Sequence, residues 1–262
     1  MVPTVIATPG TWCLRKDLST SDPDFRAIDI QTNNVTINCN SFRLQNLATG
    51  TGPYSSGVAV GGGSSNVTVR NCTIDGFGYG IWITGSPPGT GYVIESNRFS
   101  QSRFVGIRMD GFGSVIRNNI LTNTGGASGT TVASGIQAFG RIDVLDNVVD
   151  GVFGEGYQGS FKAIGITAGD ANQLNTPEGT FVGFEVRGNR VRNLLQKNDV
   201  SEGIVVSGTG ILVSDNPIGQ PTPTVGWGVV CFGDARARDN VVKNYGIGVG
   251  GACTDDGGNV AY

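Results

Sequence analysis

Two short motifs of alternating apolar and polar residues recur along the chain. In the first motif a small residue precedes apolar-x-apolar, and its nine copies begin at Ala27, Gly57, Gly80, Gly106, Gly135, Gly165, Gly203, Gly228 and Gly246. The second motif, apolar-x-x-Asn-x-apolar, lies downstream and is centred on Asn40, Asn97, Asn119, Asn147, Asn189, Asn216 and Asn240, with Cys72 in the Asn place of one copy and Asn259 in a weaker one. Such short alternation has the period of a strand with one buried face, and no window sustains a helical stripe. The pattern therefore predicts short strands and few helices.

The two motifs alternate along almost the whole chain. Successive copies of the first motif begin 30, 23, 26, 29, 30, 38, 25 and 18 residues apart. Internal repeats of this size are typical of solenoids, in which each repeat forms one coil and the coils differ in loop length. We therefore predict an all-β solenoid of about nine coils in a single domain, 1–262. In this interpretation residues 1–26 cap the N-terminal end, residues 27–250 form the coils, and residues 251–262 form the C-terminal end.

The recurring Asn predicts a sharp corner between two strands. Asn tolerates the left-handed backbone conformation better than any residue except Gly. Its amide also both donates and accepts, so Asn side chains stacked about 4.8 Å apart can hydrogen-bond from coil to coil. We therefore expect a structural asparagine ladder without a catalytic role, formed by Asn97, Asn119, Asn147, Asn189, Asn216 and Asn240.

The alternation of the two motifs over residues 27–259 resembles the right-handed parallel β-helix repeat of the pectin-lyase-like superfamily. The segments Gly10–Leu14 and Asn34–Ile37 resemble the start of its carbohydrate-binding and sugar-hydrolysis (NosD-like) branch. The resemblance implies three parallel sheets, with the first motif forming the first sheet and the strands before and after the Asn forming the second and third. It also implies that ligands, usually polysaccharides, lie across the first sheet. The catalytic signatures of polygalacturonases and pectate lyases are missing, since the chain has no His.

The middle rungs of the first sheet carry the residues that best fit a binding site. The third residue of each first motif and the residue two positions further on are expected to face outward. On contiguous rungs these positions hold Trp82, Arg108, Asp110, Gln137 and Phe139. Aromatic rings stack on the apolar faces of sugars, while charged and amide groups bond hydroxyls. We therefore predict a polysaccharide-binding groove, walled by the long connections 122–134, 150–163, 169–180 and 192–202.

Two reactions are open to an enzyme with this groove. Glycoside hydrolysis needs two carboxyl groups about 5–5.5 Å or 6.5–9.5 Å apart. Asp110 and Asp170, two coils apart, would stand about 10 Å apart, and Glu155 from a flanking loop is an alternative. A uronate lyase would instead use Arg108 or Lys162 to neutralise the substrate carboxylate or take its α-proton, with Ca²⁺ held by Asp110 and Asp170. No other cofactor is expected.

The competing hypothesis is a non-catalytic carbohydrate-binding or surface-assembly module. Its basis is an apolar set of outward positions near the C-terminal end, Val205, Val230 and Phe232, with Trp227 nearby. An exposed apolar patch marks an interface more often than a polar substrate site. These residues therefore predict a surface for self-association or for a protein partner.

Composition and charge exclude several partners. The net charge is −3, and no run of Lys or Arg provides a footprint for nucleic acid or an anionic membrane. No apolar stretch approaches the ~18–20 residues of a membrane span. Periplasmic metal delivery, a function of the NosD-like branch, is disfavoured because the chain has no His and two Met. Gly, at 43 of 262 residues, has an architectural role in this interpretation.

The five cysteines favour disulfides over a metal site. They lack the close pairing that structural zinc requires, and there is no His to complete a mixed site. Cys13 with Cys39, and Cys231 with Cys253, each enclose about one coil of chain. Bridges of this kind would join neighbouring coils at the two ends in an oxidising compartment. We therefore expect a secreted or periplasmic protein, although Val2–Pro9 is too short for a secretory apolar segment.

Overall fold

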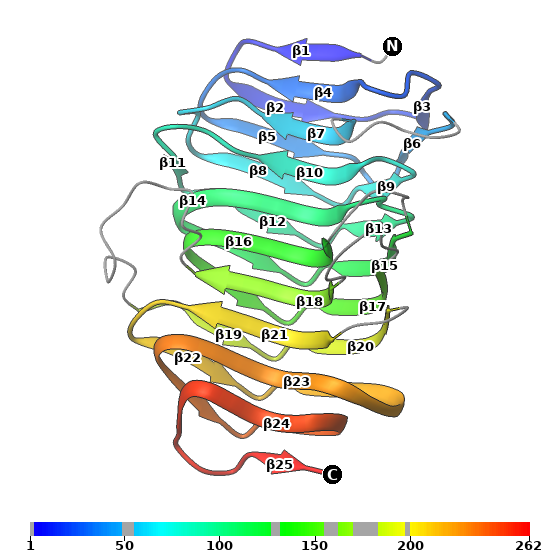
Figure 1. Ribbon diagram of the computed structural model, residues 1–262. Helices are drawn as coiled ribbons and strands as arrows, with labels where there is room; N and C mark the ends of the chain where they lie inside the picture. Colours follow the sequence, from blue (N-terminus) through cyan, green and yellow to red (C-terminus); the bar gives the residue numbers. More distant parts are fainter. Residues whose placement is uncertain (1–2, 49–54, 127–131, 155–161, 170–182, 197–199) are drawn as a thin grey trace.

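The strands stack in three parallel columns around a common axis (Figure 1). The computed structural model describes residues 3–48, 55–126, 132–154, 162–169, 183–196 and 200–262. Within these residues every strand pairs in parallel with the equivalent strand of the next coil, and no helix is present. The predicted all-β solenoid is confirmed.

The first sheet contains all nine copies of the first motif. Its strands, in spatial order, are β1 (Thr4–Ile6), β4 (Arg26–Ile30), β7 (Ser56–Val60), β10 (Tyr79–Ile83), β14 (Val105–Arg117), β16 (Val132–Leu145), β18 (Lys162–Gly169), β21 (Ser201–Ser207), β23 (Pro217–Arg238) and β24 (Val241–Asp255). The nine motif rungs enclose eight full turns, and β1 adds one rung before them. The long strands β14, β16, β23 and β24 continue around a corner into a second sheet.

The second and third sheets complete each coil. The second sheet stacks β2 (Gly10–Cys13), β5 (Val35–Asn38), β8 (Val67–Arg70), β12 (Val93–Glu95), β19 (Glu185–Arg187) and β22 (Ile211–Ser214) with parts of the long strands. The third stacks β3 (Leu18–Thr20), β6 (Arg43–Asn46), β9 (Thr73–Asp75), β13 (Arg98–Ser100), β15 (Ile120–Gly125), β17 (Val148–Gly154), β20 (Arg190–Gln196) and β25 (Val260–Ala261), again with parts of β23 and β24. A short strand, β11 (Gly89–Thr90), pairs with β14 at one corner.

Apolar side chains from all three sheets fill the interior. Ile107 of the first sheet, Ile116 of the second and Leu121 of the third are at most 1% exposed, and equivalent residues of other coils are buried in the same way. Complete burial of one such side chain stabilises the fold by about 1.5–3 kcal/mol. The period-two alternation of the sequence therefore gives each strand one face in this core.

The small residue that opens the first motif lies where two coils approach most closely. A Cβ at Gly106 would lie 2.7 Å from the carbonyl oxygen of Gly135, and a Cβ at Gly135 would lie 2.7 Å from that of Gly165. The backbone of the next coil therefore excludes larger residues. This contact explains why Gly recurs at the position.

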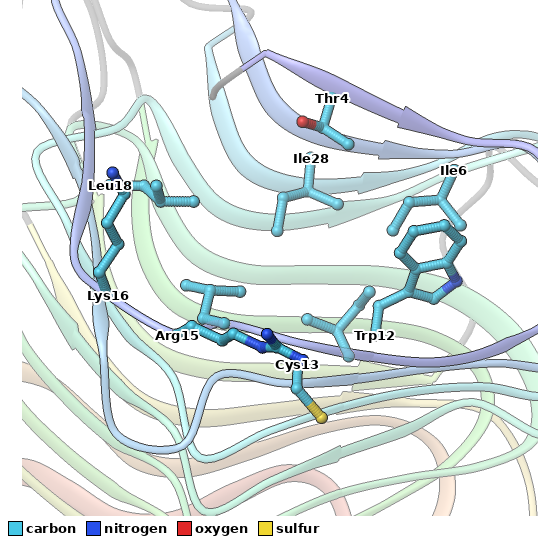
Figure 2. A pocket seen from close by; sticks show the side chains of 10 residues that line it. Thr4, Ile6, Trp12, Cys13, Arg15, Lys16, Leu18 and Ile28 are labelled. Atoms are coloured by element: carbon cyan, nitrogen blue, oxygen red, sulfur yellow. The ribbon is translucent and has the colours of Figure 1, made fainter.

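The interior opens at the N-terminal end into a pocket of about 270 Å³. Ile6, Leu18 and Ile28 line it, with Trp12 at one side and Lys16 at the other (Figure 2). The lining is mostly the apolar core of the first coil. The pocket is therefore the exposed end of the hydrophobic interior.

A column of asparagines joins the second sheet to the third. Asn119 Nδ2 donates to Asn147 Oδ1 at 3.0 Å and to the Ile94 carbonyl oxygen at 2.9 Å. The same pair of bonds recurs from coil to coil at Asn97, Asn147, Asn189, Asn216 and Asn240, and Asn240 donates to Asn259. Because the ladder asparagines up to Asn240 are at most 1% exposed, these bonds satisfy polar groups that water does not reach.

The left-handed residue of this corner precedes the ladder Asn. The φ angle is 55° at Asn118 and 54° at Asp146, whereas Asn119 and Asn147 lie outside the left-handed region. The expectation that the ladder Asn itself adopts this conformation is therefore wrong. Asn and Asp suit the preceding position because their short polar side chains tolerate positive φ.

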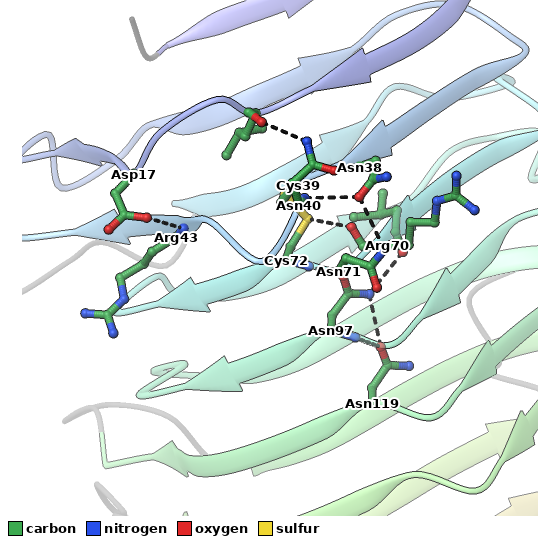
Figure 3. The surroundings of a disulfide bond; sticks show 12 residues. Asp17, Asn38, Cys39, Asn40, Arg43, Arg70, Asn71, Cys72, Asn97 and Asn119 are labelled. Atoms are coloured by element: carbon green, nitrogen blue, oxygen red, sulfur yellow. Dashed lines mark hydrogen bonds between the residues drawn. A yellow bond between two sulfur atoms is a disulfide. The ribbon is translucent and has the colours of Figure 1, made fainter.

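A disulfide takes the place of the ladder in the first two coils. Cys39 is bonded to Cys72, and the Cys72 backbone N–H donates to Asn97 Oδ1 (Figure 3). Asn40, which the sequence pattern placed at the corner, is exposed and bonds the Leu14 carbonyl oxygen instead. The corner between β5 and β6 contains extra residues, so the fixed spacing of the second motif assigned the wrong residue.

The two predicted disulfides have different outcomes. Cys231 is bonded to Cys253, as expected. The predicted pairing of Cys13 with Cys39 is wrong, since Cys39 is bonded to Cys72 and Cys13 is an exposed free thiol. Cys13 is in register with Asn38, the residue before the buried Cys39.

Candidate functional site

The outward residues of the first sheet lie in the predicted columns. Strand register places Trp82 beside Arg108 and Arg108 beside Gln137, followed by Thr167. A second column, two residues further along each strand, places Asp110 beside Phe139. The structure therefore brings together Trp82, Arg108, Asp110, Gln137 and Phe139, which we name the central face.

Three aromatic rings meet at one edge of the central face. The Tyr79 and Trp82 rings are stacked, with centroids 5.2 Å apart and an angle of 18° between the planes. The centroid of the Phe104 ring lies 6.2 Å from that of Tyr79. The Arg26 guanidinium lies 5.5 Å from the Trp82 ring and also pairs with Asp29. These half-buried rings, which we name the ring stack (Tyr79, Trp82 and Phe104), provide an apolar surface of the kind that packs against sugar rings.

Arg108 connects the polar groups of the central face. Its Nη1 donates to Gln137 Oε1 at 3.4 Å, and its Nε lies 3.7 Å from Asp110 Oδ1. Its guanidinium carbon also lies 5.1 Å from the centroid of the Phe139 ring. The Arg108 side chain is 19% exposed. It therefore presents part of a fixed, positively charged group to solvent.

Asp110 is less accessible than its position in the sequence pattern implies. The residue is 7% exposed, and burial raises the pKa of its carboxyl, although the Arg108 charge acts in the opposite direction. Tyr92 lies close by. Burial raises the pKa of the Tyr92 phenol, and the Asp110 charge adds to that effect. Asp110 therefore holds Arg108 in place more readily than it contacts a large ligand.

Comparison with known proteins identifies the family. The model of the right-handed β-helix region matches residues 16–141 and 56–260, which together cover most of the chain. The chain belongs to the right-handed β-helix family. No curated protein sequence matches it.

Several solved β-helix structures are similar to this one. A double mutant of the tailspike protein of E. coli bacteriophage HK620 aligns at 12% identity and a TM-score of 0.53, over 98% of this chain and 59% of the tailspike chain. A mutant of the same tailspike in complex with a pentasaccharide aligns at 10% identity and a TM-score of 0.50, over 98% and 60% of the two chains. An alginate lyase from Paenibacillus sp. str. FPU-7 aligns at 12% identity and a TM-score of 0.49, over 97% and 92%. This β-helix thus spans about three fifths of those tailspike chains, and identities this low show the fold alone.

Lys162 lies apart from the central face. Its Nζ bonds Glu202 Oε1 at 2.8 Å, at the start of β18. Gly169, at the other end of β18, is in register with the Asp110 column, roughly 23 Å further along the strand. The structure therefore does not bring Lys162 together with Arg108.

The predicted pair of carboxyl groups is only partly described. Asp170 and Glu155 lie outside the described residues, as do parts of the long connections expected to wall the groove. The next described carboxylate of this face is Asp29, three rungs before Arg108. Three rungs correspond to about 14 Å, which exceeds the separation that glycoside hydrolysis requires.

The Ca²⁺ site of the uronate lyase hypothesis depends on the same carboxyl groups. The described part of this β-helix contains no group of three or more His, Cys, Asp or Glu side chains able to hold a metal. Asp110 is buried beside Arg108, whose charge opposes a cation. The described residues therefore do not fit the Ca²⁺ that a uronate lyase would use.

The predicted apolar patch near the C-terminal end is covered at one of its positions, while Val205 and Trp227 are half-buried. Val230 is 4% exposed, so it cannot contribute to a contact surface as expected, whereas Phe232 is 58% exposed. The Trp227 ring lies so close to Gly250 of the last rung that it would meet a Cβ there. Trp227 thus packs over the end of the sheet.

The described residues contain no helix long and apolar enough to cross a membrane.

The sequence analysis missed Arg26, Tyr79 and Phe104. Tyr79 directly precedes Gly80, the small residue of its motif, and Phe104 lies two residues before Gly106. Only the outward positions after the small residue were considered. An aromatic residue one or two positions before the motif was the available signal.

Proposed function

We propose that this protein is an exported β-helix protein that binds a polysaccharide across the central face and the ring stack. The observation that carries the proposal is the stacked pair Tyr79 and Trp82, one rung from the Arg108–Gln137 pair. An apolar ring surface beside fixed amide and guanidinium groups matches the alternating faces and hydroxyls of a sugar chain. Two disulfides support export, because such bonds persist in oxidising compartments.

The fold is compatible with this proposal. The tailspike mutant that shares the fold is in complex with a pentasaccharide. At 10% identity it supports a surface large enough for an oligosaccharide, while the choice of ligand rests on the residues of the central face. Binding, not cleavage, is the activity that the described residues support, since Asp110 and Asp29 are too far apart to act as a hydrolytic pair.

A glycan array followed by affinity titration tests the proposal. We expect Trp82→Ala to weaken binding of the selected oligosaccharide about tenfold or more, because a ring at the centre of a contact surface contributes strongly. Phe232→Ala is the matched control, since Phe232 is an exposed ring on the same sheet several rungs away. The proposal fails if no saccharide binds, or if Trp82→Ala binds as tightly as the unmodified protein.

The same samples show whether binding leads to turnover. New reducing ends without unsaturated sugar would indicate hydrolysis, and absorbance from an unsaturated product would indicate a uronate lyase. If either is detected, Arg108→Ala and Asp110→Ala determine whether the central face carries the reaction. Unchanged turnover in both variants would place the reaction elsewhere.

A further inference from the structure

A second concave surface lies at the corner where the third sheet turns into the first. It is a groove of about 480 Å³, which we name the corner groove, and its lining includes Asn46, Gly76, Gln101, Arg103, Asn123 and Phe153. These residues come from five successive coils. Because coils are about 4.8 Å apart, the groove extends roughly 19 Å along the axis. Its shape suits a chain better than a compact small molecule.

Two amide side chains of the corner groove are available to a ligand. Gln101 and Asn123 have φ angles of 53° at equivalent positions of neighbouring coils. Gly76 and Gly151 occupy that position in the coils on either side, also with positive φ. Both amide residues are exposed, and neither side chain hydrogen-bonds to another described residue. Gln101 is thus a long amide at a position where Gly or Asn is conformationally easier.

The described lining of the corner groove carries a positive charge. Arg103 lines the groove, and none of the described lining residues is Asp or Glu. Within the described residues Arg103 forms no ion pair. Asp75, which directly precedes the lining residue Gly76, is not itself part of the lining. Its carboxylate accepts hydrogen bonds from Gln45 and Ser100. The half-buried Arg103 therefore provides a positive charge in a protein of net charge −3.

The corner groove adjoins the ring stack. Arg103 and Phe104 are consecutive, and the Phe104 ring lies 6.2 Å from that of Tyr79. Phe153 contributes a further half-buried ring on the fifth coil. An extended ligand on the ring stack can therefore continue into the groove.

We infer that the corner groove binds carboxylate-bearing units of an acidic polysaccharide. Arg103 bonds the sugar carboxylate, Gln101 and Asn123 bond hydroxyls, and Phe153 packs against a ring face. This inference rests on the proposed function and adds the substrate class to it. A neutral polysaccharide would leave the Arg103 charge without a matching group.

Calorimetric titration with two kinds of probe tests this inference. The acidic probes are hexamers of galacturonate, mannuronate and guluronate, and the neutral probe is a glucose hexamer. We expect a uronate hexamer to bind, and Arg103→Gln to weaken that binding at least about tenfold, because a charge-assisted hydrogen bond is lost. Arg98→Gln is the matched control, since Arg98 is an exposed residue of the same coil outside the groove. It should leave the affinity unchanged.

A second variant separates binding from folding. Gln101→Gly removes the amide and suits the positive φ, so it should weaken uronate binding while thermal unfolding stays at or above that of the unmodified protein. The inference is overturned if Arg103→Gln binds the uronate hexamers normally, if Arg98→Gln weakens them equally, or if the neutral hexamer binds as tightly. If binding depends on Trp82 but is unchanged by Arg103→Gln, this inference is overturned while the proposed function stands. Absence of all saccharide binding would overturn the proposed function as well.

Discussion

The backbone N–H of Cys72 donates to Asn97 Oδ1 at 3.0 Å, so the asparagine ladder begins directly beside the Cys39–Cys72 disulfide (Figure 3). One buried column therefore joins the coils by a covalent bond at its start and by amide hydrogen bonds afterwards. Both kinds of bond fix the distance between neighbouring coils. That spacing sets the positions of the outward residues on the first sheet.

Asn147→Ala is expected to destabilise the protein by about 2–4 kcal/mol. Asn147 donates to the Ile116 carbonyl oxygen and to Asn189, and it accepts from Asn119, so its removal leaves several buried polar groups without partners. Urea unfolding followed by circular dichroism measures the effect. Asn259→Ala, at the partly exposed end of the ladder, should cost about 1 kcal/mol. Equal losses in the two variants would contradict a buried ladder.

Thiol labelling should modify one cysteine of the native, oxidised protein. Cys13 is exposed and free, whereas the other four cysteines are in disulfides. Mass spectrometry after iodoacetamide treatment should therefore show one adduct, and peptide mapping should place it on Cys13. Reduction in denaturant should raise the number to five, the total in the sequence. A Cys13–Cys39 peptide would show that the disulfide assignment is incorrect.

Loss of the Cys39–Cys72 bridge should lower stability by about 3–4 kcal/mol. The bond closes a loop with a sequence separation of 33 residues, and the estimate follows from the loop entropy of the unfolded chain. Comparing Cys39→Ala/Cys72→Ala with the unmodified protein in urea measures it. A Cys13→Ala variant controls for loss of a cysteine outside any bridge, and its unfolding midpoint should not change.

The fold was predictable because its signal is repeated. Each first motif places one residue, such as Ile107, in the core and the next, Arg108, outside, and nine copies of the pattern reinforce one another. The second motif was less reliable where a corner changes length. At Asn40 the extra residues moved the buried position to Cys39, which no fixed spacing could show.

The site was predictable in its columns but not in its accessibility. Register follows from the repeats, so Arg108 and Gln137 were correctly placed side by side. Exposure depends on neighbours from other segments, and Asp110 and Val230 are buried although their positions face outward in the pattern. The corner groove depends on five coils together. Its residues, such as Arg103, belong to neither motif.

Gly135→Ala should destabilise the protein by about 1–3 kcal/mol or more. A Cβ there would lie 2.5 Å from Val149 Cγ1 and 2.7 Å from the Gly165 carbonyl oxygen, and the backbone oxygen cannot move without displacing the next coil. Gly219→Ala is the matched control, since the nearest atom to its Cβ would be Lys243 Cβ at an ordinary 3.7 Å. It should change the free energy of unfolding by less than about 0.5 kcal/mol. Similar effects of both substitutions would argue against close contact between these coils.

Asp110→Asn should change how stability depends on pH. Burial raises the pKa of the Asp110 carboxyl, with the Arg108 charge opposing the shift. A carboxyl with a raised pKa favours folding fully below its unfolded value, about 3.9, and this contribution is lost as pH rises through the folded pKa. The free energy of unfolding of Asp110→Asn, minus that of the unmodified protein, should therefore increase as pH rises from about 3 and then level off.

Asp255→Asn provides a comparison of opposite sign for the same pH series. The Gly257 backbone N–H and the Asn259 amide lower the pKa of the Asp255 carboxyl. A lowered pKa favours folding above the unfolded value, and this contribution is lost as pH falls through the folded pKa. Relative to the unmodified protein, Asp255→Asn should thus be less stable at neutral pH, with the gap closing in acid. The urea midpoints of Asp110→Asn and the unmodified protein could instead differ by the same amount at every pH. In that case burial does not raise the pKa of the Asp110 carboxyl, and Asp110 is open to ligands.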